Sequence, residues 1–437
     1  MLKKYILLIF IPIFTYSFEL DFEKALNISL SNNNELKILE KELTVAKLKV
    51  SGNFANLYLP SISAGGNFTY QFFTNGENTT TYVQGDRTIE ITNQFPDNYT
   101  LSIGVDKQLF AGFKNVNNYQ LAILDFELKQ KEYRDKQKEI WQNLFESYFK
   151  LILINSKLET LKFNLQFSSN QLRQSEEKFK LNLITLFELN QTNINLKNEY
   201  LNYLQYLNEY KKEEQNLMKI MGVNTNLTPL DTIDSVSKYI SNDVPEKEEA
   251  KKIVLSNNLQ CVTYDYNLKK EEINKNTLEW SRLPAVYASF DYRWRYERDN
   301  IAINKRSWQR NWQVGLSFSL PIDSILPDSS TDISIKQSKE NIEKIKLQKK
   351  SYESDLFNTI ENYYSDLNYY SQAVKISEER LKLATENLNY AKKLKELKRI
   401  NDLEYAQYEL SYLNTRDDYY SILYNYYLSL AKILRNL

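Results

Sequence analysis

Two long stretches of the chain, 114–179 and 332–397, contain neither proline nor glycine and repeat apolar residues at every seventh position. The repeating residues are Leu144, Leu151, Leu158, Leu165, Leu172 and Phe179 in the first stretch, and Ile360, Leu367, Val374, Leu381 and Leu388 in the second. Sustained heptads are typical of coiled-coil helices. At about 1.5 Å per residue, each stretch extends about 100 Å as one helix. A returning helix is expected after each, over 183–222 and 399–437, so that each half of the chain forms a helical hairpin.

The two halves of the chain resemble each other. Short segments of the first half recur in the same order in the second half: 30–34 as 255–258, 59–60 as 283–284, and 184–188 as 400–404. A repeated order of this kind predicts two homologous units rather than chance matches. We therefore expect a first repeat over 18–222 and a second over 246–437. The stretch 223–245, with two prolines and several Asp, Ser and Thr residues, is expected to be the linker.

Four shorter segments alternate apolar and polar residues with a period of two: 61–73, 99–109, 285–297 and 309–320. Strict alternation over about ten residues, with aromatic residues toward the segment ends, is typical of transmembrane β-strands. The alternative is a half-buried sheet of a water-soluble protein. The connections 74–97 and 298–308 are polar, as loops exposed to solvent would be.

The first 17 residues have the features of a secretory signal peptide. Lys3 and Lys4 precede an apolar run, and Thr15 and Ser17 provide small residues before an expected cleavage at Phe18. An uncleaved membrane anchor is the alternative. No later segment has about 18 consecutive apolar residues, which argues against a helical transmembrane protein.

Four strands are too few for a membrane-spanning barrel, because the smallest outer-membrane barrels have eight. An open sheet edge is not tolerated in lipid, since its backbone groups would lack hydrogen bonds. The strand pattern therefore predicts a barrel shared between several copies of the chain.

The composition argues against catalysis and nucleic-acid binding. The 56 basic and 56 acidic residues cancel, so the chain lacks the positive excess that nucleic-acid binding uses. There is no histidine, and a single cysteine, Cys261, rules out an intrachain disulfide or a multi-thiolate zinc site. No phosphate-binding glycine loop or metal-ligand spacing is present. We expect no catalytic residue, no cofactor, no metal and no nucleic-acid partner.

In the order of its segments the chain resembles the TolC family of outer-membrane efflux and secretion ducts. The resemblance rests on the duplicated halves, the Leu-Pro strand entries at 59–60 and 283–284, the strand exits 109–112 and 320–322, and the tip segments 178–184 and 394–400. It implies an α+β membrane protein in which each protomer gives four β-strands to a 12-stranded barrel shared by a homotrimer. A long α-helical coiled-coil tunnel continues the barrel into the periplasm, and the linker 223–245 forms part of a belt around it.

The same resemblance implies a function. Such ducts lie in the outer membrane, contact its lipid, and conduct substrates passively from a periplasmic adaptor protein and an inner-membrane pump to the exterior. Asp291, Arg293, Arg295 and Glu297 are expected to line the barrel lumen and to adjust ion preference. The main alternative is an exported structural coiled coil or adaptor that bridges the periplasm without a pore. An exported hydrolase has no supporting motif.

The tip turns depart from the family pattern, which usually has glycine in a left-handed conformation there. Here the turn positions are Asn182 and Lys398, and the resemblance places both where the adaptor docks. Asparagine tolerates positive φ fairly well, whereas lysine predicts either strain or a turn of another shape.

Acidic residues in the returning helices narrow the closed end of well-studied relatives. Counted from the turns, the equivalent positions are Glu188 and Glu404. Three copies of each carboxylate around a threefold axis would attract cations and oppose anions. Asp402 and Arg399 are expected to add to this charge or to neutralise it. A solvated helix face is the alternative for both glutamates.

Overall fold

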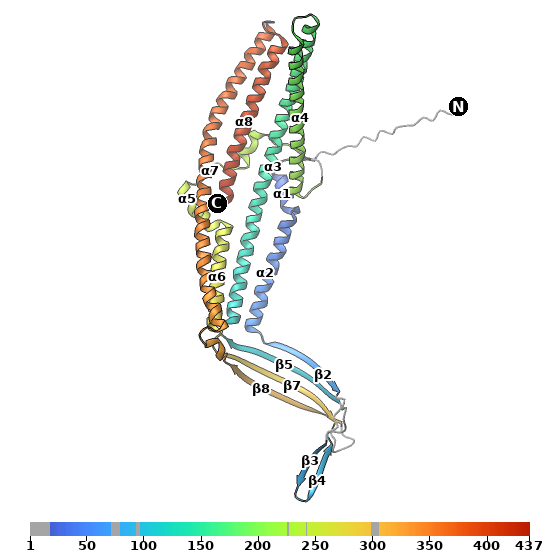
Figure 1. Cartoon of the computed structure of the whole chain (residues 1–437), viewed down its shortest axis with the longest axis vertical. Helices are drawn as coiled ribbons and strands as arrows, with labels where there is room; N and C mark the ends of the chain where they lie inside the picture. Colours follow the sequence, from blue (N-terminus) through green and yellow to red (C-terminus); the bar gives the residue numbers. More distant parts are fainter. Residues whose placement is uncertain (1–17, 71–78, 93–96, 225–226, 242, 299–305) are drawn as a thin grey trace, which may run out of the picture. The chain divides into compact units, whose positions relative to one another are not determined.

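The computed structural model describes residues 18–70, 79–92, 97–224, 227–241, 243–298 and 306–437 (Figure 1). The predicted signal segment 1–17 and parts of both predicted loops lie outside these residues. The chain divides into two compact units, and each takes segments from both halves of the sequence. The first unit consists of the described residues of 18–42, 130–262 and 349–437, and the second of those of 43–129 and 263–348.

The second unit contains a four-stranded antiparallel sheet. Its strands are β2 (Ser61–Tyr70), β5 (Asp97–Ala111), β7 (Ala285–Arg298) and β8 (Arg306–Ser319), in the order β2-β5-β7-β8. The register places Ile62, Val105, Phe290 and Val314 in one row across the sheet, and Ser63, Gly104, Asp291 and Gln313 in the next. Because neighbouring rows point to opposite faces, one face is apolar and the other polar. The prediction of four alternating strands is confirmed.

A second hairpin lies within the segment that we expected to be a loop, 74–97. It consists of β3 (Thr79–Gln84) and β4 (Arg87–Thr92), which pair antiparallel around Gly85 and Asp86. Gly85 has a φ of +64°, a conformation that glycine adopts without a steric penalty. The Gly-Asp dipeptide between two runs of Thr, Ile, Val and Tyr is a hairpin signal that the sequence analysis did not use.

Helices make up most of the chain. The long ones are α2 (Asn34–Tyr58), α3 (Lys114–Lys180), α4 (Leu186–Met221), α6 (Leu259–Trp280), α7 (Ser330–Glu396) and α8 (Asp402–Asn436), and the short ones are α1 (Phe22–Asn32) and α5 (Lys247–Asn257). Within the described ranges, none of them combines the length and the apolar character that crossing a bilayer requires. The expected pair of long helices, each followed by a returning helix, is present.

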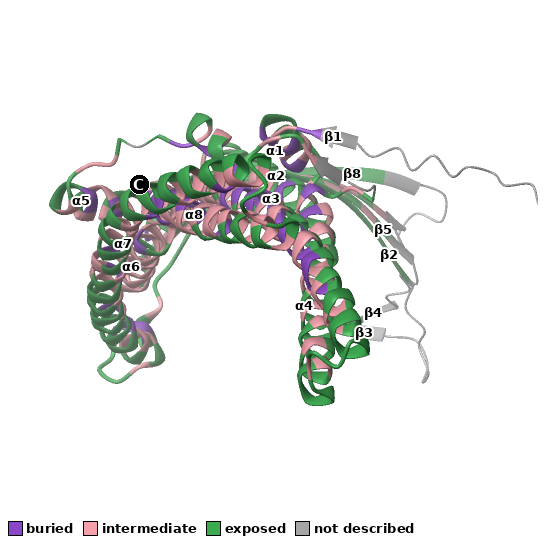
Figure 2. Cartoon of the chain, turned by 90° about the horizontal axis from the view of Figure 1, so that it is seen from above, coloured by how far each residue is buried: buried purple, intermediate pink, exposed green. Residues whose placement is uncertain are grey.

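In the first unit four helices lie side by side in the order α4, α3, α8, α7 (Figures 1 and 2). Asn164 on α3 donates to Glu199 on α4 at 2.5 Å, and Ser156 on α3 donates to Asp417 on α8 at 3.2 Å. Arg380 on α7 pairs with Asp418 on α8 at 3.4 Å. The heptad residues of α3 face this packing, and Leu144 and Leu151 are fully buried. Consequently α4 and α7 are the two edge helices of the unit.

The hydrophobic core of the first unit lies where the chain entry and the linker meet α3. Phe22 packs against the aromatic rings of Phe145, Tyr148 and Phe149 with centroid distances between 5.6 and 5.9 Å. The linker takes part through β6 (Leu227–Pro229), which pairs in parallel with β1 (Phe18–Leu20), and through a 3-10 helix, Ile233–Lys238. The sequence analysis did not predict this pairing.

One linker carboxylate holds this region together. Asp231 accepts hydrogen bonds from the backbone N–H of Phe22 at 2.9 Å and from the hydroxyls of Tyr148 at 2.8 Å and Tyr239 at 2.9 Å. Burial, followed by the neighbouring Asp231 carboxylate, raises the pKa of Tyr239 to about 12. Both tyrosines therefore remain neutral donors at physiological pH.

Candidate functional site

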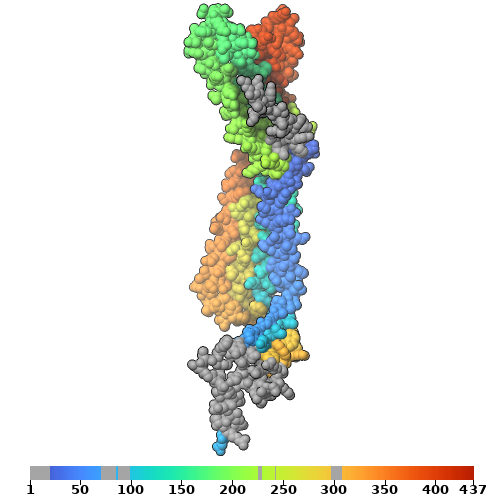
Figure 3. Space-filling model, turned by 90° about the vertical axis from the view of Figure 1, so that its right-hand side faces the viewer, coloured from blue at the N-terminus to red at the C-terminus, as the bar shows by residue number. Residues whose placement is uncertain are grey.

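The two tips of the first unit are the turns between α3 and α4 and between α7 and α8, and Figure 3 shows them as two separate lobes. Helices α3 and α7, which lead into these turns, each end in a Schellman motif. At the first tip, Leu183 N–H donates to the Lys178 carbonyl at 2.9 Å, and Asn182 N–H to that of Phe179 at 2.9 Å. At the second, the equivalent bonds run from Arg399 to Leu394 at 2.8 Å and from Lys398 to Lys395 at 2.9 Å.

Asn182 and Lys398 occupy the left-handed position of these motifs, with φ values of +53° and +54°. Of the two outcomes expected for lysine, strain or a turn of another shape, the backbone takes the first. The cost of this conformation for a residue with a Cβ is about 1–2 kcal/mol.

Glu188 and Glu404 each close a capping box at the start of a returning helix. The Glu188 carboxylate accepts from the backbone N–H of Thr185 at 2.7 Å, and that of Glu404 accepts from the N–H of Asn401 at 3.0 Å. The hydrogen bonds from the backbone and hydroxyl of Thr185 lower the pKa of Glu188. Both glutamates thus have a local structural role, in addition to the gating role that remains a prediction.

The other two predicted gate residues lie beside the second capping box. Asp402, almost fully exposed, pairs with Lys395 at 3.0 Å, and the same ammonium lies 4.4 Å from the ring centroid of Tyr405. Arg399 is exposed, and its backbone N–H completes the Schellman motif. Across the described ranges, no three His, Cys, Asp or Glu residues are grouped so that they could hold a metal ion.

The two tips differ in the character of their surfaces. The first exposes four large apolar side chains, Leu181, Leu183, Leu186 and Phe187, the last of them 76% exposed. At the equivalent places the second has Leu397, Arg399, Asp402 and Leu403. The backbone is therefore repeated at the two tips, while the chemistry that each presents is different.

The predicted lumen residues follow one another on the polar face of β7. Asp291 and Arg293 form an ion pair at 3.7 Å, and both retain substantial exposure. Arg295 lies further along the same face and is exposed. The backbone of Glu297 pairs with Ser307, but its side chain lies outside the described part of the structure.

A row of aromatic rings crosses the apolar face of the sheet. Phe68, Tyr99, Tyr296 and Trp308 come from the four strands in turn, and their registers place them directly opposite one another. Successive ring centroids are 4.6, 5.8 and 5.5 Å apart. The rest of this face is also exposed, including Trp312, Val314, Leu316 and Phe318 on β8. A large exposed apolar face bordered by aromatic rings matches the lipid-facing band of an outer-membrane barrel.

Both edge helices of the first unit carry exposed apolar stripes. On α7 the stripe is Tyr369, Ile376, Leu383 and Tyr390, continued by Leu397, and each of these residues is 60–67% exposed. On α4 it is Phe187, Ile194 and Leu201. The spacing of seven is typical of coiled-coil seams, and neither stripe is covered by another described segment of the chain. The sequence analysis missed them, although their spacing is readable in the sequence.

One protein-family model is similar to the first half of the chain. The model of the outer membrane efflux protein family matches residues 25–223. The match covers a little under half of the chain, which is similar to this family over that stretch. No curated protein sequence matches it closely enough to count as a relative.

Solved structures of transmembrane channels and outer-membrane proteins share the fold over nearly the whole chain. A structure of CusC has 13% identity and a TM-score of 0.72, covering 96% of this chain and 93% of that one. The CmeC channel of Campylobacter jejuni has 15% identity and a TM-score of 0.66, with 95% and 85% covered. VceC of Vibrio cholerae has 13% identity and a TM-score of 0.69, with 95% of both chains covered. The similarity includes the second half, which the family model does not reach.

Proposed function

We propose that this protein is the outer-membrane duct of a tripartite efflux pump or a type I secretion system, and that it conducts substrates passively to the exterior. The observation that carries the proposal is the exposed apolar face of the four-stranded sheet with its aromatic row, Phe68, Tyr99, Tyr296 and Trp308. An exported coiled coil without a pore has no use for such a face in water, where exposed apolar area promotes aggregation.

The sheet also supports the proposed stoichiometry. Its outer strands, β2 and β8, each have one side without a partner strand among the described residues. In lipid these edges must pair, so β8 of one copy would join β2 of the next. Three copies of four strands make a barrel of 12, within the size range of outer-membrane barrels.

The edge helices of the first unit also support assembly of several copies, with α4 of one copy packed against α7 of the next. Helix α4 runs away from its tip and α7 runs toward its own, so the two stripes are antiparallel when α4 of one copy meets α7 of another. Counted from the tips, this arrangement places Phe187 level with Leu397, Ile194 with Tyr390, and Leu201 with Leu383. Because both stripes repeat every seven residues, an apolar residue of one helix lies opposite an apolar residue of the other at every step along the seam.

The tips are the proposed contact with the periplasmic adaptor, through which the inner-membrane pump delivers substrate. Asn182 and Lys398 fix the two turns, and Glu188 and Glu404, with Asp402 and Arg399 beside them, are the proposed constriction. In the barrel, Asp291, Arg293, Arg295 and Glu297 are proposed to face the water-filled lumen.

Disulfide trapping tests the assembly. In a Cys261→Ala background, Ile194→Cys combined with Tyr390→Cys is expected to give a covalent trimer on a denaturing gel under oxidising conditions. Asn193→Cys with Tyr390→Cys is the matched control, because residue 193 is exposed but lies about 100° round the helix from 194. Equal crosslinking of both pairs, or none of the first, would contradict the proposed seam.

A further inference from the structure

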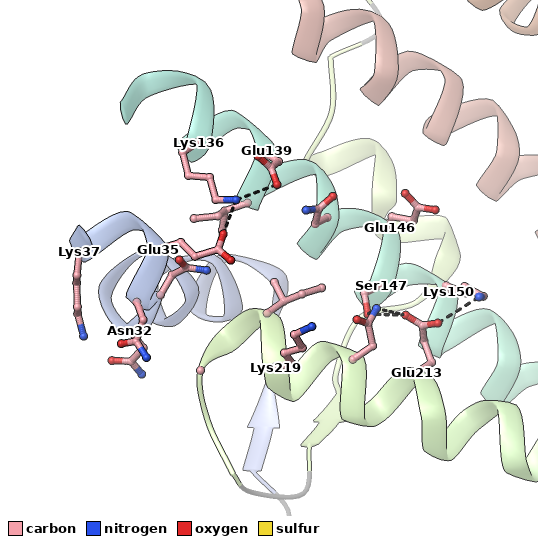
Figure 4. Close-up of a pocket in the computed structure, with 17 residues that line it drawn as sticks. Asn32, Glu35, Lys37, Lys136, Glu139, Glu146, Ser147, Lys150, Glu213 and Lys219 are labelled. Atoms are coloured by element: carbon pink, nitrogen blue, oxygen red, sulfur yellow. Dashed lines mark hydrogen bonds and ion pairs between the residues drawn. The ribbon is translucent and has the colours of Figure 1, made fainter. Parts of the chain in front are cut away.

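A polar cavity of about 870 Å³ lies in the first unit, between the α1–α2 junction, α3 and the last turns of α4 (Figure 4). Its α3 wall is one helix face, because Lys136, Glu139, Asn143, Ser147 and Lys150 follow one another at steps of three and four. In a coiled coil, residues at such spacings are usually apolar and buried. Here they are polar and border open space.

Two charged clusters hold the walls in place. Lys136 pairs with Glu35 at 2.5 Å and with Glu139 at 2.9 Å on one side. On the other side, Glu213 accepts from Ser147 at 2.6 Å and pairs with Lys150 at 3.1 Å. Burial would raise the pKa of Glu213, but the hydrogen bonds and the lysine outweigh it and lower the pKa. These charges are thus satisfied within the protein.

Six other lining side chains are exposed to solvent and have no partner among the described residues, whereas Asn33 and Asn216 do have one. In the described part of the chain, no hydrogen bond or ion pair is made by the side chains of Asn32, Asn34, Lys37, Asn143, Glu146 and Lys219. Figure 4 shows Lys219 extending into the space between the two charged clusters. Asparagine amides offer both donors and acceptors, so they match groups that also do both.

The charge and the polarity of the lining residues indicate which class of ligand the cavity can bind. Four lysines and four glutamates line the cavity, so its net charge is zero, and no aromatic residue is among its lining residues. A cation or an anion would therefore meet like charges as well as opposite ones. An aromatic drug-like molecule would find little of the apolar surface that holds such ligands, because Ile140 and Ile220 contribute only the smaller part of the lining.

We propose that this cavity binds a neutral oligosaccharide. Sugar hydroxyls donate and accept hydrogen bonds, as the Asn32, Asn34 and Asn143 amides do, and the charged clusters provide fixed partners around them. The volume lies within the usual range of ligand sites, about 300–1,000 Å³. Sugar binding in this cavity would be a function separate from the conduction of substrates. In the periplasm, where the proposed function places this unit, the N-acetylated glycan strands of the cell wall are a source of such sugars.

Calorimetric titration of the purified, detergent-solubilised protein tests this inference, with triacetylchitotriose and maltotriose as probes. We expect saturable binding of triacetylchitotriose that Asn143→Leu weakens about tenfold, because an amide is replaced by a side chain that cannot hydrogen-bond. Asn208→Leu is the matched control, since Asn208 is exposed on α4 away from the cavity, and it should bind like the wild type.

The probes also separate the sources of the sugar. Preference for triacetylchitotriose supports the cell-wall glycan, and equal binding of maltotriose supports an oligosaccharide site of broader range. Absence of saturable binding by both sugars, or unchanged affinity in the Asn143→Leu variant, overturns the proposal. Conductance of the same preparation keeps the two hypotheses apart, because a conducting protein that binds no sugar contradicts this inference alone.

Discussion

Asn182 and Lys398, which are 216 residues apart (398 − 182), adopt the same left-handed backbone conformation, with φ values of +53° and +54°. The equivalence extends to the bonds around them, because each turn has the same two Schellman hydrogen bonds and is followed by a capping box three residues later. The side chains nevertheless differ, with an apolar first tip and a charged second tip. The two tips thus have the same turn and different surfaces.

The lysine turn is strained, and relieving it should stabilise the second tip. Lys398→Gly removes the Cβ that disfavours positive φ, a gain of about 1 kcal/mol. We expect about fivefold slower hydrogen–deuterium exchange in peptides that cover 395–405. Asn182→Gly should gain less at the first tip, since asparagine tolerates this conformation better. Faster exchange in Lys398→Gly would contradict the assigned turn.

Gly112 links β5 to α3 at a place where no side chain fits. It has a φ of +57°, and a Cβ there would lie 2.2 Å from the Trp280 carbonyl oxygen. We expect Gly112→Ala to destabilise the protein by more than about 2 kcal/mol, measured by urea unfolding. Gly52→Ala is the matched control: its Cβ would meet nothing within 4 Å on helix α2, so it should stabilise by up to about 1 kcal/mol. Equal effects of the two substitutions would refute this assignment.

The Asp231 cluster should make the first unit sensitive to alkali. Burial raises the pKa of Tyr239 to about 12 and that of Tyr148 well above its usual range, each with Asp231 as a further cause. Tyrosine in the unfolded chain has a pKa of about 10. The contribution of these two neutral tyrosines to the stability is therefore complete below that pH and is lost as the pH rises toward 12. The free energy of unfolding, measured at pH 9, 10 and 11, should fall by up to about 1.4 kcal/mol per pH unit for each tyrosine.

Removing both hydroxyls provides the check on this pH dependence. A Tyr148→Phe, Tyr239→Phe variant should be less stable at pH 8, because Asp231 loses two donors, and its stability should change less above pH 10. The exposed Tyr58→Phe, outside both stripes, should retain the wild-type dependence. A double variant as alkali-sensitive as the wild type would show that other groups cause the loss.

The proposed gate can be separated from the capping role by a single type of substitution. Glutamine still serves as the third residue of a capping box, so Glu188→Gln with Glu404→Gln should leave the tips folded. It removes the carboxylate charges, so the preference for cations over anions should fall in reversal-potential measurements. Glu386→Gln, exposed on α7, is the control and should keep the wild-type preference. Unchanged selectivity in the double variant would restrict both glutamates to capping.

Much of the fold could be predicted because its signals are periodic. The heptads from Leu144 to Phe179 identified α3, and the alternation from Phe290 to Trp294 identified β7 together with the face that each residue occupies. Such patterns depend only on helix and strand geometry, which are local. The left-handed turn at Asn182 was expected from the resemblance to the TolC family, and asparagine tolerates that conformation.

The features that escaped prediction depend on contacts between distant residues. Asp231 is one of three aspartates in the linker, and nothing nearby in the sequence indicates that it contacts Phe22 and Tyr148, which are 209 and 83 residues away. The strands β1 and β6 have three residues each, too few for a period to appear. The stripe from Tyr369 to Leu397 could be read from its spacing of seven, but it was not predicted.

Single-channel recording of the purified trimer in planar lipid bilayers tests the account most directly. The account predicts discrete, long-lived conductance steps, one per inserted trimer, with a preference for cations. A monomeric protein that stays in the aqueous phase and produces no steps would contradict it.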